Sequence, residues 1–147
     1  MVCTFFGHRR VYEKIEPTLR STLIDLIENH NVVKFYVGNH GGFDSMVRSV
    51  LKELSAQYPI TYYVVLAYMP GKQDHPDLTD FSDTIFPESV ATAPKRFAIT
   101  YRNRWMIKQS DFVVTYVKNH IGSGAAQFKE LAEKQGKTVI ELGEENR

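Results

Sequence analysis

The sequence predicts an α/β fold with three layers, in which helices cover both faces of a five-stranded, mainly parallel sheet. Two features support this prediction. Short apolar runs of strand length alternate with longer segments whose apolar residues recur at helical spacing, an order typical of βαβ units. The short runs are also apolar almost without interruption, as expected for strands that are buried on both faces.

The first half of the chain contains two strand–helix units. Val2–Phe6 is a short β-rich run that ends at Gly7, and Val32–Val37 ends in the same way at Gly38. The apolar stripe of the first helix, Pro17–His30, is Leu19, Leu23, Leu26 and Ile27. The stripe of the second helix, Asp44–Tyr58, is Met46, Val47, Val50, Leu51 and Leu54. Asp44 or Ser45 is the predicted N-cap of this second helix.

The second half continues the alternation after one long loop. Ile60–Met69 is the third apolar run, and Pro70-Gly71 ends it. Residues 70–94 show no clear period, and a short edge strand at Asp83–Phe86 is an open alternative within them. The remaining predicted elements are a helix at Ala93–Ser110, a strand at Asp111–Val117, a helix at Ala125–Gln135 that Gly136 ends, and a strand at Lys137–Leu142.

The order of these elements also predicts the sheet topology. Right-handed crossovers between parallel strands favour the Rossmann-like strand order 3-2-1-4-5, numbered along the chain. The sequence contains no repeat, low-complexity tract or second domain that we can recognise, so residues 1–147 are expected to form one domain.

Composition narrows the classes of partner. The 147-residue chain has a formal net charge of +1, which gives no bulk attraction to nucleic acid, so we do not expect a nucleic-acid partner. No apolar run approaches the roughly 20 residues of a membrane-spanning helix. The first residues also lack the pattern of a signal peptide. We therefore expect a cytoplasmic protein that does not bind membranes.

Three polar loops follow the first, second and fourth predicted strands. They are Gly7-His8-Arg9-Arg10, the segment from Gly38 to Asp44, and the segment from Asn119 to Ala125. The predicted strand order makes these loops neighbours at the carboxyl edge of the sheet, where open α/β sheets bind ligands. Glycines allow the backbone to approach a ligand closely, and helix N-termini favour phosphate. The loops therefore predict a site for a small phosphate-bearing ligand.

Histidines recur in the same three loops, as His8, His40 and His120. Three imidazoles could hold zinc, but no carboxylate or cysteine accompanies them at ligand spacing, and the chain has one cysteine. We therefore expect no metal site and no cofactor. General acid–base work by His8 or His40 is an open alternative.

Two arginines on the predicted helix Ala93–Ser110 cannot share one helical face. Arg102 and Arg104 are two residues apart, which places them about 200° apart around a helix. Either both are solvated beside a buried Trp105, or one points to solvent and the other to the top of the sheet.

These loops and this helix resemble the SLOG superfamily, the Rossmann-like group that unites the DprA/Smf and LOG families. The matching segments are Phe6-Gly7-His8-Arg9, Gly38-Asn39-His40-Gly41-Gly42-Phe43-Asp44, Arg102-Asn103-Arg104-Trp105-Met106 with Ser110-Asp111, and Gly122-Ser123-Gly124. The resemblance is strongest to the small bacterial and phage YpsA-like branch of unknown function. It implies a site for a nucleotide-derived ligand and a homo-oligomeric protein.

The resemblance also allows LOG-type chemistry, the hydrolysis of the N-glycosidic bond of nucleoside 5′-monophosphates. In that family an arginine on the third helix acts with a glutamate after a Gly-rich turn. Arg102 matches the arginine, but Phe128 falls on the glutamate position and cannot handle a proton. Asp44 or Glu130 would have to supply the carboxylate if the chain were an N-glycosidase.

The favoured interpretation is thus a sensor or regulatory module that binds a nucleotide or an ADP-ribose-like ligand. The predicted ligand-binding residues are Gly7, His8, Arg9, Gly38, Asn39, Gly41, Gly42, Asp44, Arg102, Gly122, Ser123 and Gly124. Of these, Gly122, Ser123 and Gly124 are expected to hold the phosphate. A LOG-like phosphoribohydrolase is the first alternative, and a protein-interaction or single-stranded-DNA module is the second.

Overall fold

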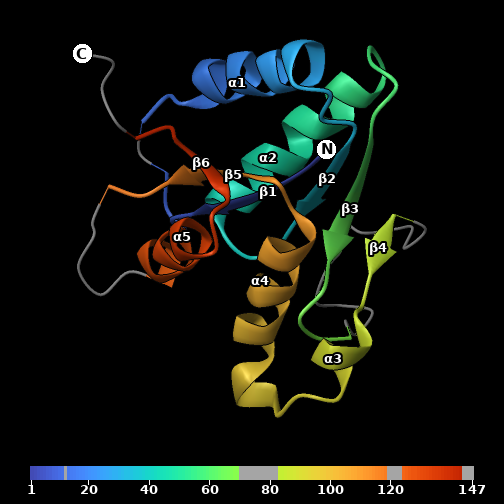
Figure 1. The fold of residues 1–147 in the computed structure, drawn as a ribbon, viewed down its shortest axis with the longest axis vertical. Coiled ribbons are helices and arrows are strands. Elements are labelled where there is room, and N and C mark those ends of the chain that lie inside the picture. The colour runs from blue at the N-terminus through green and yellow to red at the C-terminus, as the bar shows by residue number, and fades with distance from the viewer. Residues whose placement is uncertain (12, 70–82, 119–123, 144–147) are drawn as a thin grey trace.

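A six-stranded sheet forms the centre of the protein (Figure 1). The computed structural model describes residues 1–11, 13–69, 83–118 and 124–143. The strands are β1 (Val2–Gly7), β2 (Lys34–Val37), β3 (Thr61–Val65), β4 (Thr84–Ile85), β5 (Phe112–Tyr116) and β6 (Thr138–Glu141). Their order is β4-β3-β2-β1-β5-β6, and every pairing is parallel. The carboxyl ends of the strands therefore share one edge.

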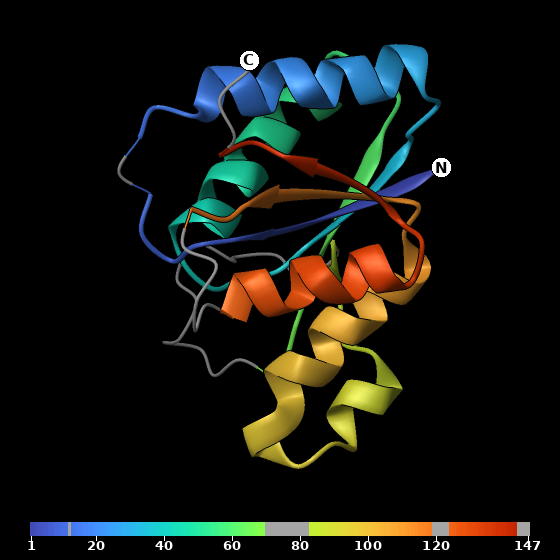
Figure 2. The same cartoon turned by 60° about the vertical axis from the view of Figure 1, so that its left-hand side comes forward.

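Helices cover both faces of this sheet. The helices are α1 (Glu16–Asn29), α2 (Gly42–Ser55), α3 (Glu88–Ala91), α4 (Ala98–Gln109) and α5 (Gly124–Lys134), and a 3-10 turn (Lys95–Phe97) precedes α4. Figure 2 shows α1 and α2 on one side of the sheet and α4 and α5 on the other. Within the described ranges, no helix has the length and apolar character needed to span a membrane.

Alternating side chains of the central strands build the two cores. Phe5 packs in the core under α1 and α2, whereas the next residue, Phe6, packs in the core under α4 and α5. In the same way Val114 belongs to the first core and Val113 to the second. This two-residue period explains the apolar runs, because each strand must present an apolar side chain to both helical layers.

The predicted five-stranded count is wrong, since the sheet has six strands. The predicted order of the other five is confirmed, and the extra strand β4 joins at the edge beside β3. It has two residues and pairs through Thr84 and Ile85 with Val64 and Val65. Two residues cannot establish a period in a sequence, which is why the segment Asp83–Phe86 could be read only as an alternative.

Some predicted boundaries also differ from the structure. The third strand ends at Val65, whereas its apolar run continues to Met69. Leu66 and Ala67 are apolar because they are buried beyond the strand end, where Ala67 packs against Val90 of α3. Burial beyond the end of β3 thus lengthened the predicted strand, and the Leu66 N–H still donates to the Ile85 carbonyl of β4 at 2.8 Å. The predicted helix Ala93–Ser110 is shorter as well, since α4 begins at Ala98.

Candidate functional site

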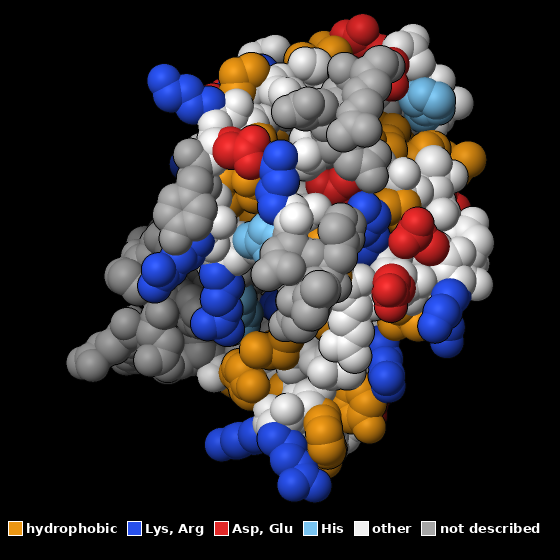
Figure 3. Space-filling model, turned by 90° about the vertical axis from the view of Figure 1, so that its left-hand side faces the viewer, with side chains coloured by type: hydrophobic (Ala, Val, Ile, Leu, Met, Phe, Trp, Pro, Cys, Tyr) orange, Lys and Arg blue, Asp and Glu red, His pale blue; other side chains and the backbone are white. Residues whose placement is uncertain are grey.

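A cleft lies at the carboxyl ends of β1 and β5, and the described residues that directly follow these strands line it together with the start of α5. Its volume is about 760 Å³, which suits a ligand of nucleotide size. Apolar side chains that line it include Phe6, Ile99, Met106 and Phe128. Charged and histidine side chains that line it are His8, Arg9, Arg10, Glu13, His40, Asp44, Arg102 and Lys118. Figure 3 faces this side of the molecule and shows Lys, Arg and His side chains gathered toward its middle.

The first loop is joined to the start of α2 through backbone groups. The Gly42 N–H donates to the Arg9 carbonyl at 2.6 Å, and the Phe43 N–H donates to the His8 carbonyl at 3.4 Å. A side chain at Gly7 would collide with the Phe43 ring. The N-terminal amides of α2 are therefore used by the neighbouring loop.

Gly41 occupies a position that favours glycine. Its φ is +93°, and an added Cβ would lie 2.8 Å from the Arg9 Cα. Gly41 is also the N-cap of α2, so the predicted capping by Asp44 or Ser45 is wrong. Asp44 lies in the first turn instead, where its Oδ2 accepts the His40 N–H at 3.1 Å. The structure thus gives Gly41, Gly42 and Gly7 clear roles in packing the two loops together.

Arg102 is held in a buried polar network at the end of β3. Its side chain is 3% exposed. Its Nε donates to Asn103 Oδ1 at 2.8 Å, and its Nη1 donates to the Val65 carbonyl at 3.2 Å and to Asn39 Oδ1 at 3.4 Å. The His40 ring lies against the same Nη1, with 3.5 Å between that atom and Nδ1. Of the two arginines that could not share a face, Arg102 points to the sheet and Arg104 is exposed.

Asp44 is the carboxylate beside Arg102. Burial raises the pKa of Asp44, and the positive charge of Arg102 opposes this effect. Burial likewise lowers the pKa of Arg102, opposed by the charge of Asp44. A Cβ added at Gly38 would lie 2.7 Å from Asp44 Oδ2 and 2.9 Å from Arg102 Nη1. Gly38 therefore leaves the space that this buried charge pair needs.

His8 connects the first loop to the loop after β5. The backbone N–H of Lys118 donates to His8 Nε2 at 2.7 Å, which makes this ring nitrogen an acceptor. The ring meets Tyr116 edge-on, with centroids 5.7 Å apart. Glu13 binds the same region, since its Oε1 lies 3.3 Å from Lys118 Nζ and accepts the Tyr116 hydroxyl at 3.1 Å.

The start of α5 forms another part of the cleft. Gly124 and Ala125 line it, and a Cβ added at Gly124 would meet no atom within 4 Å among the described residues, its chain neighbours and its own helix backbone aside. The predicted phosphate-binding residues Gly122 and Ser123, like His120, lie outside the described residues. Phe128 stacks on Phe6 with 5.6 Å between ring centroids.

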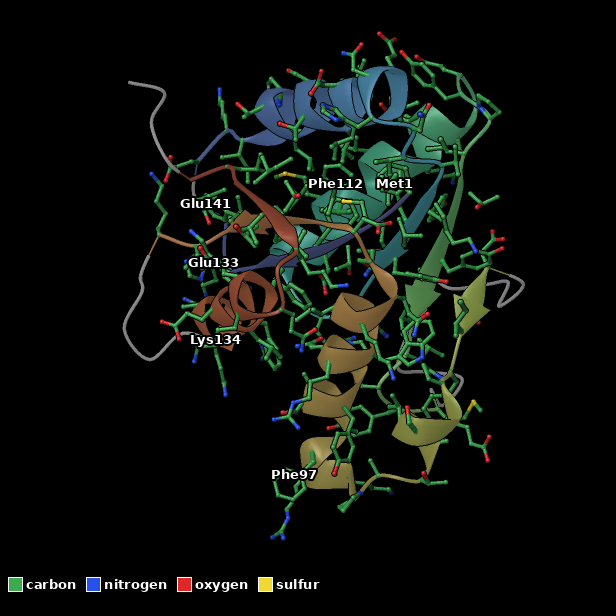
Figure 4. The ribbon with its side chains drawn as sticks, in the orientation of Figure 1. Met1, Phe97, Phe112, Glu133, Lys134 and Glu141 are labelled. Carbon is green, nitrogen blue, oxygen red and sulfur yellow. The ribbon has the colours of Figure 1, made fainter. Side chains whose placement is uncertain are left out.

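Sequence reasoning missed a carboxylate that fixes the end of β5. Glu141, labelled in Figure 4, is the last residue of β6. Its side chain is 4% exposed. It accepts the Val117 N–H at 3.0 Å and the Thr115 hydroxyl at 2.7 Å, and it pairs with Lys129 Nζ at 3.2 Å. The only signal in the sequence is a carboxylate at the end of an apolar strand.

The three candidate catalytic residues lie in different surroundings. Arg102 and Asp44 both line the cleft and form the buried charge pair. Glu130 is exposed on α5 and is not among the described residues that line the cleft. The structure therefore brings two of the three together.

Of three comparisons with known proteins, one found matches, namely the comparison with solved structures. No family model matches the chain, and no curated protein matches it. DNA processing protein A from Helicobacter pylori superposes with a TM-score of 0.67 at 16% identity, over 96% of this chain and 64% of that one. DNA processing protein A (DprA) from Streptococcus pneumoniae superposes with a TM-score of 0.68 at 16% identity, over 95% of this chain and 49% of that one.

These matches establish a DprA-like, Rossmann-like fold and correct one expectation. The chain spans 64% of the length of the first structure and 49% of the length of the second. The Helicobacter pylori structure is described for its single-stranded DNA binding mode. The expectation that this chain has no nucleic-acid partner is therefore wrong, since a structure with this fold is described as binding single-stranded DNA. It relied on net charge, and net charge does not describe how cations are distributed over a fold.

Proposed function

We propose that this chain binds single-stranded nucleic acid, with one nucleotide unit seated in the cleft at the ends of β1 and β5. The observation that carries the proposal is the excess of cationic side chains in a cleft of nucleotide size. Arg9, Arg10, Lys118 and Arg102 line it, against the carboxylates of Glu13 and Asp44. Single-stranded DNA is the ligand class named for one of the two structures that share the fold.

The two carboxylates are already engaged with protein groups. Asp44 is buried beside Arg102, and Glu13 contacts Lys118 and Tyr116. Arg9 and Arg10 are exposed at the cleft. An arginine can bind a phosphate through two N–H groups at once, which makes these two residues the proposed phosphate contacts. The open first turn of α5 at Gly124 adds N–H groups that favour an anion.

Apolar walls supply a place for the sugar and base. Phe6, Met106 and Phe128 line the cleft beside the charged groups. Binding of single strands combines a basic surface that follows the backbone with apolar or aromatic surfaces for bases. This combination favours a nucleotide unit over a simple anion.

The test is fluorescence anisotropy with a labelled oligo(dT), measured over a range of salt concentrations. The variant carries Arg9→Ala and Arg10→Ala. Its matched control carries Lys52→Ala and Lys134→Ala, which remove the same charge from the last turns of α2 and α5. We expect the variant alone to lose affinity roughly tenfold or more and its log–log salt slope to fall by about 0.7 for each lost phosphate contact. Equal affinities for variant and control would contradict the proposal.

A free nucleotide-derived ligand is the second candidate function. The specific observation in its favour is the volume of about 760 Å³, which accommodates one small molecule. Competition distinguishes the candidates. A mononucleotide or ADP-ribose that binds by calorimetry more tightly than oligo(dT) would favour the free ligand. An oligonucleotide that binds more tightly than its monomer favours the single strand. Membership of the YpsA-like branch remains a prediction in either case.

A further inference from the structure

A second groove lies on the side of α4 that faces away from the cleft. Its volume is about 510 Å³, and α3, the segment after it, and α4 line it. The side chains of α4 in this groove are Tyr101, Arg104, Trp105 and Lys108. The cleft described above instead receives Ile99, Arg102, Asn103 and Met106 of the same helix. One helix thus separates two hollows.

The spacing of the groove residues follows helical geometry. Positions 101, 104, 105 and 108 stand at i, i+3, i+4 and i+7, which places them on one face. Tyr101 is 38% exposed, and Arg104 and Lys108 are exposed. Trp105 is half-buried and meets the edge of Tyr36 at 5.0 Å between centroids. The indole is therefore anchored against the sheet while it lines the groove.

Cations dominate the charge of this surface. Arg104 and Lys108 are the charged side chains among the described residues that line the groove. Lys95 and Arg96 lie exposed just before α4, and the Arg96 guanidinium stands 4.7 Å from the centroid of the Phe97 ring. Phe97 is 43% exposed at the end of α4 that points away from the sheet (Figure 4). Aromatic rings and cations thus alternate along the helix.

We propose that this basic and aromatic groove is a second contact site for single-stranded nucleic acid. Bases stack on Tyr101 and Trp105, and phosphates pair with Arg104 and Lys108. The ligand class is that of the proposed function, on which this inference rests, but the surface and its residues are different.

Charge complementarity favours this occupant over a second copy of the chain. A two-fold contact through the groove would set the same patch against itself, so Arg104 and Lys108 would face cations of the partner. Like charges across an interface are unfavourable. A polyanion with stacking bases matches both features of the surface.

The single tryptophan makes the groove directly observable. Trp105 is the one tryptophan of the chain, so all tryptophan emission comes from a side chain that lines this groove. The full chain is titrated with oligo(dT) of increasing length, while anisotropy of a labelled strand reports total binding. We expect the emission of Trp105 to be quenched as longer strands bind. We also expect Tyr101→Ala to weaken binding roughly tenfold, the order expected for one lost stacked base.

Charge variants separate this inference from the proposed function. The variant with Arg104→Ala and Lys108→Ala should weaken binding of long strands, whereas the Lys52→Ala and Lys134→Ala control should not.

The possible outcomes distinguish the two proposed sites. Binding by anisotropy without a change in Trp105 emission would overturn the proposal for the groove and leave the proposal for the cleft standing. If the Arg9→Ala and Arg10→Ala variant keeps both its affinity and the quenching of Trp105 emission, the proposal for the cleft is overturned and the proposal for the groove stands. If neither anisotropy nor Trp105 emission changes on addition of oligo(dT), both the proposed function and this inference are contradicted. Dimerisation in native mass spectrometry that Tyr101→Ala abolishes would assign the groove to self-association and overturn the proposal.

Discussion

The first turns of α2 and α5 both follow a strand at the same edge of the sheet, yet they are used differently. In α2, the amides of Gly42 and Phe43 donate to carbonyls of the first loop, and Asp44 is buried beside Arg102. In α5, Gly124 borders the cleft, and the described residues outside its own helix leave the position of an added Cβ open. The same sequence pattern, glycine at the start of a helix, thus has two outcomes. In α2 it allows two loops to pack together, and in α5 it leaves the start of the helix accessible to a ligand.

The largest expected effect comes from removing the carboxylate of α2's first turn. Asp44→Ala leaves Arg102 buried without its neighbouring negative charge, and we expect a loss of about 3–5 kcal/mol in the free energy of unfolding. Denaturant unfolding measures this change. Gln127→Ala, in the first turn of α5 and exposed, is the matched control and should change stability by less than about 0.5 kcal/mol. Equal effects at both sites would remove the distinction between the two turns.

Removal of the carboxylate that fixes β5 should have the next largest effect. Glu141→Gln loses charge-assisted bonds from the Val117 amide and from Lys129, which we expect to cost about 1–3 kcal/mol of stability. The melting temperature measured by circular dichroism tests this. The exposed Glu133 of α5, labelled in Figure 4, offers a control in Glu133→Gln. A melting temperature for Glu141→Gln that matches this control would show that the bonds contribute little.

Alanine in place of the two glycines sharpens the comparison directly. Gly41→Ala forces a Cβ at positive φ against Arg9, and we expect a cost of about 1–3 kcal/mol. Gly124→Ala meets open space and should leave stability within about 0.5 kcal/mol of the wild type. Chemical denaturation of the two variants side by side is sufficient. A large cost at Gly124 would mean that α5's first turn is packed after all.

A charged residue at Gly124 should change the free energy of unfolding least of all these substitutions while clearly weakening nucleic-acid binding. Gly124→Asp introduces an anion at the cleft without a steric clash, so we expect nearly unchanged unfolding but roughly tenfold weaker oligo(dT) binding. Gly124→Asn has the same shape without the charge and should bind more tightly than the aspartate variant. Identical affinities for the two variants would place the bound phosphate away from α5.

The sequence predicted the arrangement of the sheet better than the use of its loops. The separation of Arg102 from Arg104 follows from helical periodicity, which is local, and the order of five strands follows from the alternation of strands and helices together with right-handed crossovers. Gly41 is needed because its backbone has a positive φ and because Arg9, some thirty residues earlier, lies against it. A local sequence pattern cannot show that contact, so it could not distinguish this structural role from ligand binding. Glu141 was missed for a similar reason, since its partner Val117 directly follows another strand, β5, and lies 24 residues earlier in the chain. Net charge failed as an exclusion because it ignores that Arg9, Arg10 and Lys118 share one cleft.

The most direct test of the central claim is an NMR titration of the ¹⁵N-labelled chain with a short oligo(dT). The account predicts that the largest amide shifts fall on Lys118, Gly124 and Ala125 at the cleft, and that Lys52 and Lys134 at the ends of their helices do not move. Shifts that concentrate on Lys52 and Lys134, with none at Gly124, would contradict the assignment of the cleft as a nucleotide-binding site.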